Sequence, residues 1–74
     1  MFEAKKDLFA KKIGQILSMT REGVSEARYE KEYDSEEQEF REWVILIYNG
    51  GFERRINVTF DSNIGMLKDV LKEI

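Results

Sequence analysis

The 74-residue chain contains no cysteine and no histidine. Without cysteine there is no disulfide framework and no thiolate nucleophile, and the absence of both residues removes the usual zinc ligands and the base of a nucleophilic triad. Positive charge is also scarce, because 15 acidic residues outnumber 12 basic ones and give a net charge of -3. A protein that binds nucleic acid directly normally carries a basic patch. We therefore expect a non-enzymatic protein with no metal site, no cofactor and no direct nucleic-acid partner.

Long apolar stretches are missing as well. The longest run, Trp43 to Tyr48, has six residues, whereas a membrane-spanning helix needs about 20. The opening MFEAKKDLFAKK alternates charged and apolar groups, whereas a secretory signal needs a continuous apolar segment. We expect a soluble cytoplasmic protein with no membrane partner. Residues 1–74 should form one domain, near the lower size limit for a single hydrophobic core.

The apolar residues that are present concentrate in residues 43–60, WVILIYNGGFERRINVTF. Two apolar runs flank the tripeptide Asn49-Gly50-Gly51. Asparagine and glycine supply the positive φ angles that tight hairpin turns require. We expect this hairpin to form the centre of a β-sheet.

Helical periodicity marks both ends of the chain. Apolar residues recur at helical spacing over residues 2–19 and again from Ile64 to Ile74, and Ser62 offers an N-cap side chain to the second helix. Gly14 weakens the first helix by roughly 1 kcal/mol relative to alanine. The apolar stripes expected to face the core are Phe2, Phe9, Ile13, Ile16 and Leu17 in the first helix and Ile64, Leu67, Val70, Leu71 and Ile74 in the second.

Residues 24–33 change to a period of two. Ala27, Tyr29, Lys31 and Tyr33 alternate there with Glu26, Arg28, Glu30 and Glu32. This alternation predicts a β-strand, and its density of charge suits the edge of a sheet. Glutamate, alanine and arginine also favour helix, so a helix from residue 24 is the competing prediction. The predicted fold is α+β: helix, three-stranded antiparallel meander and helix (αβββα), with the second strand central and both helices on one face of the sheet.

The turn of the central hairpin determines which residues face the core. A two-residue turn at Asn49-Gly50 places Tyr48 opposite Gly51, whereas a three-residue loop exchanges the two faces of the second strand. With the two-residue turn, the core face collects Trp43, Ile45, Ile47, Phe52, Ile56, Val58 and Phe60. The opposite face then exposes an apolar stripe bordered by polar groups, which is typical of a partner-binding or dimer surface: Val44, Leu46 and Tyr48.

Charge is unevenly distributed along the chain. Between Glu26 and Glu42 there are eight acidic and three basic residues, a net of -5, so the rest of the chain carries a net of +2. In an extended strand, next-but-one carboxylates lie roughly 7 Å apart on one side. Such a series can bind a basic protein groove that normally holds nucleic acid. The candidate partner-binding residues are Glu26, Glu30, Glu32, Asp34, Glu36, Glu37 and Glu39.

In size, acidity and the strand-NGG-strand-helix order of their ending, residues 24–74 resemble small phage anti-CRISPR proteins, which occupy the DNA-binding surface of Cas nucleases. The resemblance lies in organisation and includes no diagnostic motif. It implies an inhibitor from a phage or mobile element that blocks the nucleic-acid-binding groove of a host defence protein. The element order is also that of double-stranded-RNA-binding domains. Where those domains carry a lysine-rich loop, this chain reads DSNIGMLKD, with Lys68 alone, so few phosphate contacts are expected there.

Two other classes of function remain open from the sequence. The first is a small homodimeric structural or accessory protein, joined through the predicted apolar face or through the edge strand. The second is a module that binds a small ligand or RNA by stacking on tyrosine rings. The residues concerned in this second class are Tyr29, Tyr33 and Tyr48.

Overall fold

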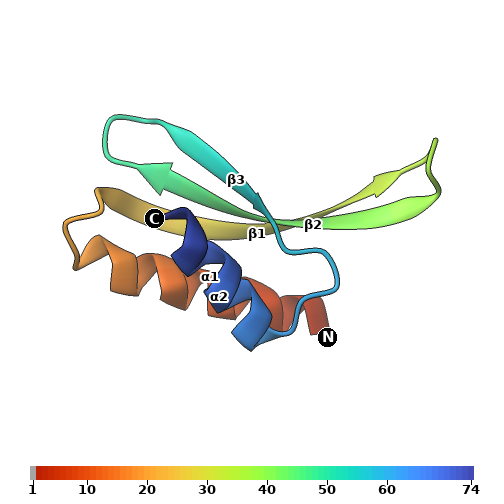
Figure 1. Cartoon of the computed structure of the whole chain (residues 1–74), viewed down its shortest axis with the longest axis horizontal. Helices are drawn as coiled ribbons and strands as arrows, with labels where there is room; N and C mark the ends of the chain where they lie inside the picture. Colours follow the sequence, from red (N-terminus) through yellow and green to blue (C-terminus); the bar gives the residue numbers. More distant parts are fainter. Residues whose placement is uncertain (1) are drawn as a thin grey trace.

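The computed structural model describes the backbone of residues 2–74 and the side chains of residues 5–74. A first helix leads into a three-stranded antiparallel meander with β2 at its centre, and a second helix follows (Figure 1). The predicted α+β order and the edge position of the first strand are confirmed, and the competing helix from residue 24 is wrong. The elements are α1 (Phe2–Ser18), β1 (Val24–Asp34), β2 (Glu39–Tyr48), β3 (Glu53–Asn57) and α2 (Asn63–Glu73).

Helix α1 lies against β1 at Gly14. A β-carbon built on Gly14 would overlap the backbone nitrogen of Ala27 and lie 2.9 Å from the carbonyl carbon of Glu26. Only glycine therefore lets the helix approach the strand this closely. The contact sets the rotation of α1, so that its buried residues are Ala10, Ile13, Gly14 and Leu17.

The rotation of α1 corrects part of the predicted apolar stripe. Ile13 and Leu17 are buried as expected, and Phe9 is half-buried against the core. Ile16 is 62% exposed, because it lies two residues from Gly14 and so on the opposite side of the helix. The side chain of Phe2 lies outside the described residues.

The central hairpin has the three-residue loop and not the two-residue turn. The Tyr48 amide donates to the Phe52 carbonyl oxygen at 2.8 Å, and the Gly51 amide donates to the Tyr48 carbonyl oxygen at 3.0 Å. Gly50 and Gly51 have φ angles of 97° and 95°, which glycine adopts without a steric penalty. In this register Tyr48 lies opposite Phe52, and the two faces of β2 are exchanged relative to the prediction.

The predicted partner-binding stripe is therefore wrong. Val44 and Leu46 are fully buried, and Tyr48 is half-buried against the same core. Ile56 and Val58 do belong to the core as predicted, but Phe52 and Phe60 are exposed. The core cluster combines both helices and all of the sheet: Ala10, Ile13, Leu17, Val24, Ala27, Val44, Leu46, Ile56, Val58, Met66 and Val70.

The face of the sheet turned away from α1, called the outer face below, carries Trp43, Ile45 and Ile47 on β2. Ile45 is only 3% exposed there, because charged side chains from the two flanking strands meet across β2. Arg28 on β1 pairs with Glu53 on β3 at 3.8 Å. Ion pairs over this face thus replace a covering layer of secondary structure.

Helix α2 begins as predicted at Ser62, whose hydroxyl oxygen accepts the Gly65 amide at 3.1 Å. The helix touches the core along a narrow line that contains Met66 and Val70. Val70 and the half-buried Leu67 confirm part of the predicted stripe. Ile64, Leu71 and Ile74 are exposed, because the observed line of contact is rotated away from them. No helix among residues 2–74 is long and apolar enough to cross a membrane.

Candidate protein-binding surface

The β1–β2 hairpin extends beyond the rest of the sheet as an arm, defined here as residues 32–41. Strand β3 pairs only with Trp43–Ile47 of β2, so the distal parts of β1 and β2 form a two-stranded ribbon that projects from the body (Figure 1). The arm lengthens the molecule to 38 Å along its longest axis, against 22 and 20 Å along the others. Its five acidic residues and one basic residue give the arm a net charge of -4.

The arm ends in a turn over residues 35–38, between the paired residues Asp34 and Glu39. The Asp34 carboxylate accepts the amides of Glu36 and Glu37 at 3.0 and 3.2 Å, which is the side-chain turn that aspartate commonly forms. Gln38 takes the left-handed φ of 55° that closes the turn. Asp34 and Glu39 thus close the ribbon, and the turn between them has four residues, 35–38.

The predicted series of carboxylates along β1 lies on the outer face, but much of its charge is neutralised. Arg55 on β3 reaches Glu30 at 3.5 Å and Glu32 at 4.0 Å. The Trp43 indole also donates to Glu32 at 2.8 Å, and the Arg55 guanidinium stacks over the Trp43 ring at 5.0 Å. These carboxylates therefore participate in the cover of the outer face and are poor candidates for binding a partner.

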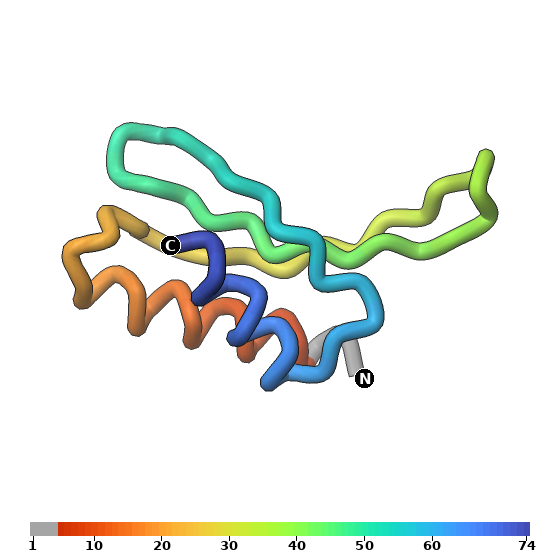
Figure 2. The backbone as a smooth tube through the Cα atoms, viewed as in Figure 1, coloured from red at the N-terminus to blue at the C-terminus, as the bar shows by residue number. Residues whose placement is uncertain are grey.

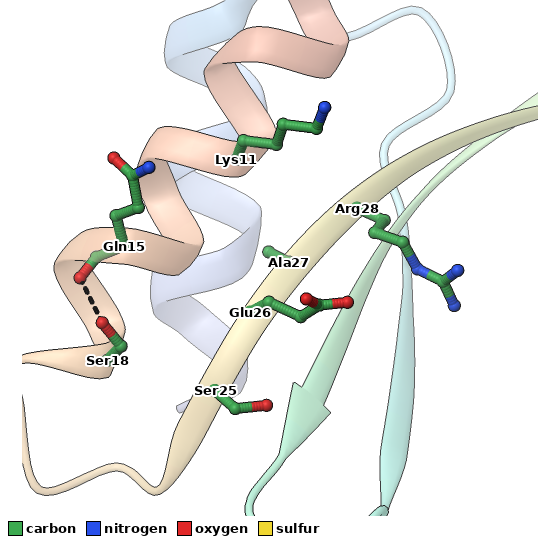
Figure 3. A pocket seen from close by; sticks show the side chains of 7 residues that line it. All are labelled: Lys11, Gln15, Ser18, Ser25, Glu26, Ala27 and Arg28. Atoms are coloured by element: carbon green, nitrogen blue, oxygen red, sulfur yellow. Dashed lines mark hydrogen bonds between the residues drawn. The ribbon is translucent and has the colours of Figure 1, made fainter.

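The candidate residues near the tip differ from those on β1 in their ion pairs, because only Asp34 has a cationic partner among the described side chains. Asp34 pairs with Arg41 at 3.2 Å. Among the side chains of residues 5–74, those of Glu36, Glu37 and Glu39 form no ion pair and are exposed. These three residues are called the acidic tip below. Glu26, the remaining candidate, lies near the start of β1, beside Ser25 and Ala27 (Figure 3). It is thus at the end of the strand opposite to the acidic tip.

The opposite side of the arm carries an aromatic pair. Tyr33 and Phe40 face each other across the ribbon with ring centroids 5.0 Å apart, and both are about half exposed. They lie on the same sheet face as Ala27 and Leu46, where the arm continues past the core. Sequence reasoning missed this pair. The alternation of β1 contains Tyr33, but only the register of the turn places Phe40 of β2 opposite it.

A buried carboxylate anchors the base of the arm. Glu42 is 6% exposed and accepts Lys6 Nζ at 2.8 and 2.9 Å, the Tyr29 hydroxyl at 2.8 Å and the Phe60 amide at 2.9 Å. Burial by itself raises the pKa of Glu42, but the hydrogen bonds from Lys6, Tyr29 and Phe60 outweigh it and lower the pKa below its usual value. The cluster ties α1, β1 and the loop before α2 to β2.

The pKa of a second carboxyl group near this cluster, that of Asp61, is raised and not lowered. A hydrogen bond with Asp69, burial and the charge of Asp69 raise the pKa of Asp61 to about 6, although Lys6 opposes the shift and Glu42 adds to it. Asp61 Oδ2 is buried and has no hydrogen-bond partner among the described residues. Because its pKa is raised in the fold, ionisation of Asp61 destabilises the folded state.

The substitution Asp61→Asn is expected to stabilise the protein at neutral pH. Because the pKa of Asp61 is raised in the fold to about 6 from 3.8, its ionisation lowers stability as the pH rises between those values. We expect the variant to gain about 1–2 kcal/mol at pH 7 and nothing below about pH 4. Urea unfolding followed by circular dichroism across this pH range measures the difference.

The matched control for this measurement is Asp7→Asn, which neutralises a partly exposed aspartate on α1. Its effect should remain below about 0.5 kcal/mol at every pH. An Asp61→Asn variant that is no more stable than the parent at pH 7 would contradict the raised pKa of Asp61.

The described residues line two surface hollows. The larger, about 380 Å³, runs between α1 and β1, and its polar groups diverge: Glu26 and Arg28 leave β1 on the side away from Lys11 and Gln15 (Figure 3). The smaller, about 240 Å³, lies between α1 and the start of α2. Its lining residues are Lys5, Leu8, Phe9, Lys12 and Asn63.

Comparisons with protein-family models, with curated proteins and with solved structures found no match to this chain.

Proposed function

We propose that the chain is a non-enzymatic cytoplasmic protein-binding module whose acidic tip engages a basic surface of a partner protein. The observation that carries this proposal is the projection of three exposed carboxylates, at Glu36, Glu37 and Glu39, on an arm that extends beyond the sheet. In its most concrete form, the partner is a nucleic-acid-binding protein of a host defence system, and the chain is a phage or mobile-element inhibitor of it. The resemblance to anti-CRISPR proteins motivates this form.

The charge distribution supports the tip over the rest of the acidic segment. Glu30 and Glu32 are held by Arg55, whereas the carboxylates of the tip are solvated and can form new ion pairs without breaking old ones. Electrostatic attraction of this kind accelerates association and selects partners of opposite charge. Tyr33 and Phe40, on the other side of the arm, add apolar area that a partner can bury.

The test is an affinity experiment with the immobilised chain and lysate from candidate hosts. We expect a basic protein to be retained at low salt and released at high salt, because solvated charges are screened. The variant Glu36→Gln/Glu37→Gln should lose at least about 90% of the retained protein, which corresponds to a tenfold loss of affinity.

The control is Glu22→Gln/Glu73→Gln, which makes the same change of net charge away from the arm and should retain the partner. Retention that resists high salt, or equal loss in both variants, would refute a role for the acidic tip.

A further inference from the structure

The smaller hollow has the properties that the acidic tip requires of a binding site. It places two lysines beside an apolar floor: Leu8 is 58% exposed, and Phe9 lies next to it. Neither Lys5 nor Lys12 forms an ion pair with any side chain in residues 5–74, whereas Lys6 is bound by Glu42 and Lys11 lies 3.6 Å from Asp7. Two ammonium groups are thus available to carboxylates from outside.

The arm cannot reach the hollow of its own chain. It continues β1 and β2 away from the body, while α1 and α2 extend from its base toward the other side (Figure 2). The paired strands run without interruption from Glu26 to the turn, so the ribbon has no hinge at which it could fold back. The acidic tip therefore meets such a hollow only on another molecule.

We propose that the acidic tip of one copy docks into the Lys5–Lys12 hollow of a second copy, and that the reverse contact closes a two-fold, salt-sensitive dimer. Each copy then contributes one arm and one hollow, so that both contacts form without leaving a site open for further growth. The proposal rests on the proposed function in one respect, since it takes the arm to be the binding element. It names a second partner for that element.

The apolar groups beside the charges fit the same arrangement. The ribbon of the arm exposes Tyr33 and Phe40, and a two-stranded ribbon is marginally stable in water by itself. Contact of these rings with Leu8 and Phe9 of a second copy buries apolar surface on both sides. The carboxylates and lysines at the rim then determine the orientation of the two chains.

Sedimentation velocity of the purified chain over a concentration series at low and high salt tests this dimer. We expect dimerisation at low salt and at least about tenfold weaker association at high salt. The tip variant Glu36→Lys/Glu37→Lys and the hollow variant Lys5→Glu/Lys12→Glu should each weaken association by about tenfold or more, because like charges then meet. All four substitutions combined in one chain should restore it. The control Lys68→Glu/Lys72→Glu, outside the hollow, should associate as the parent does.

Three results would overturn the proposal. One is a parent chain that stays monomeric at every concentration, and another is a combined variant that fails to dimerise although circular dichroism shows it folded. The third is binding of the monomer to phosphatidylserine vesicles that is lost in the hollow variant, since this would assign the lysines to anionic lipid.

The failure of the dimer and the failure of the proposed function are distinguishable. A monomeric chain that still retains a foreign protein through its tip refutes the dimer alone. A chain that dimerises by the charge-swap criterion yet retains no foreign protein refutes the proposed function alone.

Discussion

Replacement of Glu42 by alanine is expected to lower the free energy of unfolding by about 3–5 kcal/mol, because it leaves the part-buried ammonium group of Lys6 without its partner. The Phe60 amide loses its acceptor at the same time. A domain of this length has a total stability of about 4–11 kcal/mol, so the variant should be near or beyond the point of unfolding. Urea titration followed by circular dichroism measures the loss.

A double substitution separates the effect of the buried charge on stability from the effect of packing in this cluster. Lys6→Met/Glu42→Leu removes both charges and retains their volume, and such replacements are often neutral or stabilising. We expect it to recover more than half of the loss seen in Glu42→Ala. A loss below about 1 kcal/mol in Glu42→Ala would mean that water satisfies Lys6 and would contradict the buried cluster.

Acid should weaken the same cluster. Because the pKa of Glu42 is lowered in the fold, its stabilisation is present above the ordinary value of 4.5 and is lost as the pH falls through the lower folded value. Asp61 has the opposite dependence at higher pH. The two carboxyl groups together favour maximal stability at mildly acidic pH, between the range where Glu42 is protonated and the range where Asp61 is ionised.

The substitution Gly14→Ala should destabilise the protein by about 2–4 kcal/mol, although alanine is the better helix former by roughly 1 kcal/mol. The added methyl group meets the backbone of Ala27 and Glu26, and a strand backbone cannot move aside as a flexible side chain can. Helix α1 must therefore lift from β1 and open the core around Ile13 and Leu17. Chemical denaturation gives the change in the free energy of unfolding.

Gly65→Ala in α2 is the matched control for Gly14→Ala. Its added methyl group would lie 3.2 Å from side-chain atoms of Asp61, which can shift by the few tenths of an ångström required. We expect a change within about 1 kcal/mol of zero, because the gain in helix propensity offsets the shift. Equal losses in both variants would show that the helix–strand contact at Gly14 is not specific.

The acidic residues of β1 show how much of a candidate binding surface can be predicted from the sequence. The alternation of β1 placed Glu26, Glu30 and Glu32 on one side of a strand, and the structure agrees. Arg55 pairs with Glu30 and Glu32 and so determines which acidic residues remain unpaired. It lies more than 20 residues away from both of them in the chain. No local pattern contains that pairing, because β3 and β1 are both neighbours of β2 and meet only across its outer face.

The sequence by itself determined the order of the elements, the edge position of the first strand, the cap at Ser62 and the electrical asymmetry of the chain. These features follow from periodicity, turn residues and charge counts, which are local properties. Only the tertiary structure decided which face of β2 is buried, because one additional residue in the Asn49-Gly50-Gly51 loop exchanges the faces. That single residue moved Val44 and Leu46 into the core, and we therefore propose the arm, with its acidic tip, as the surface that binds a partner.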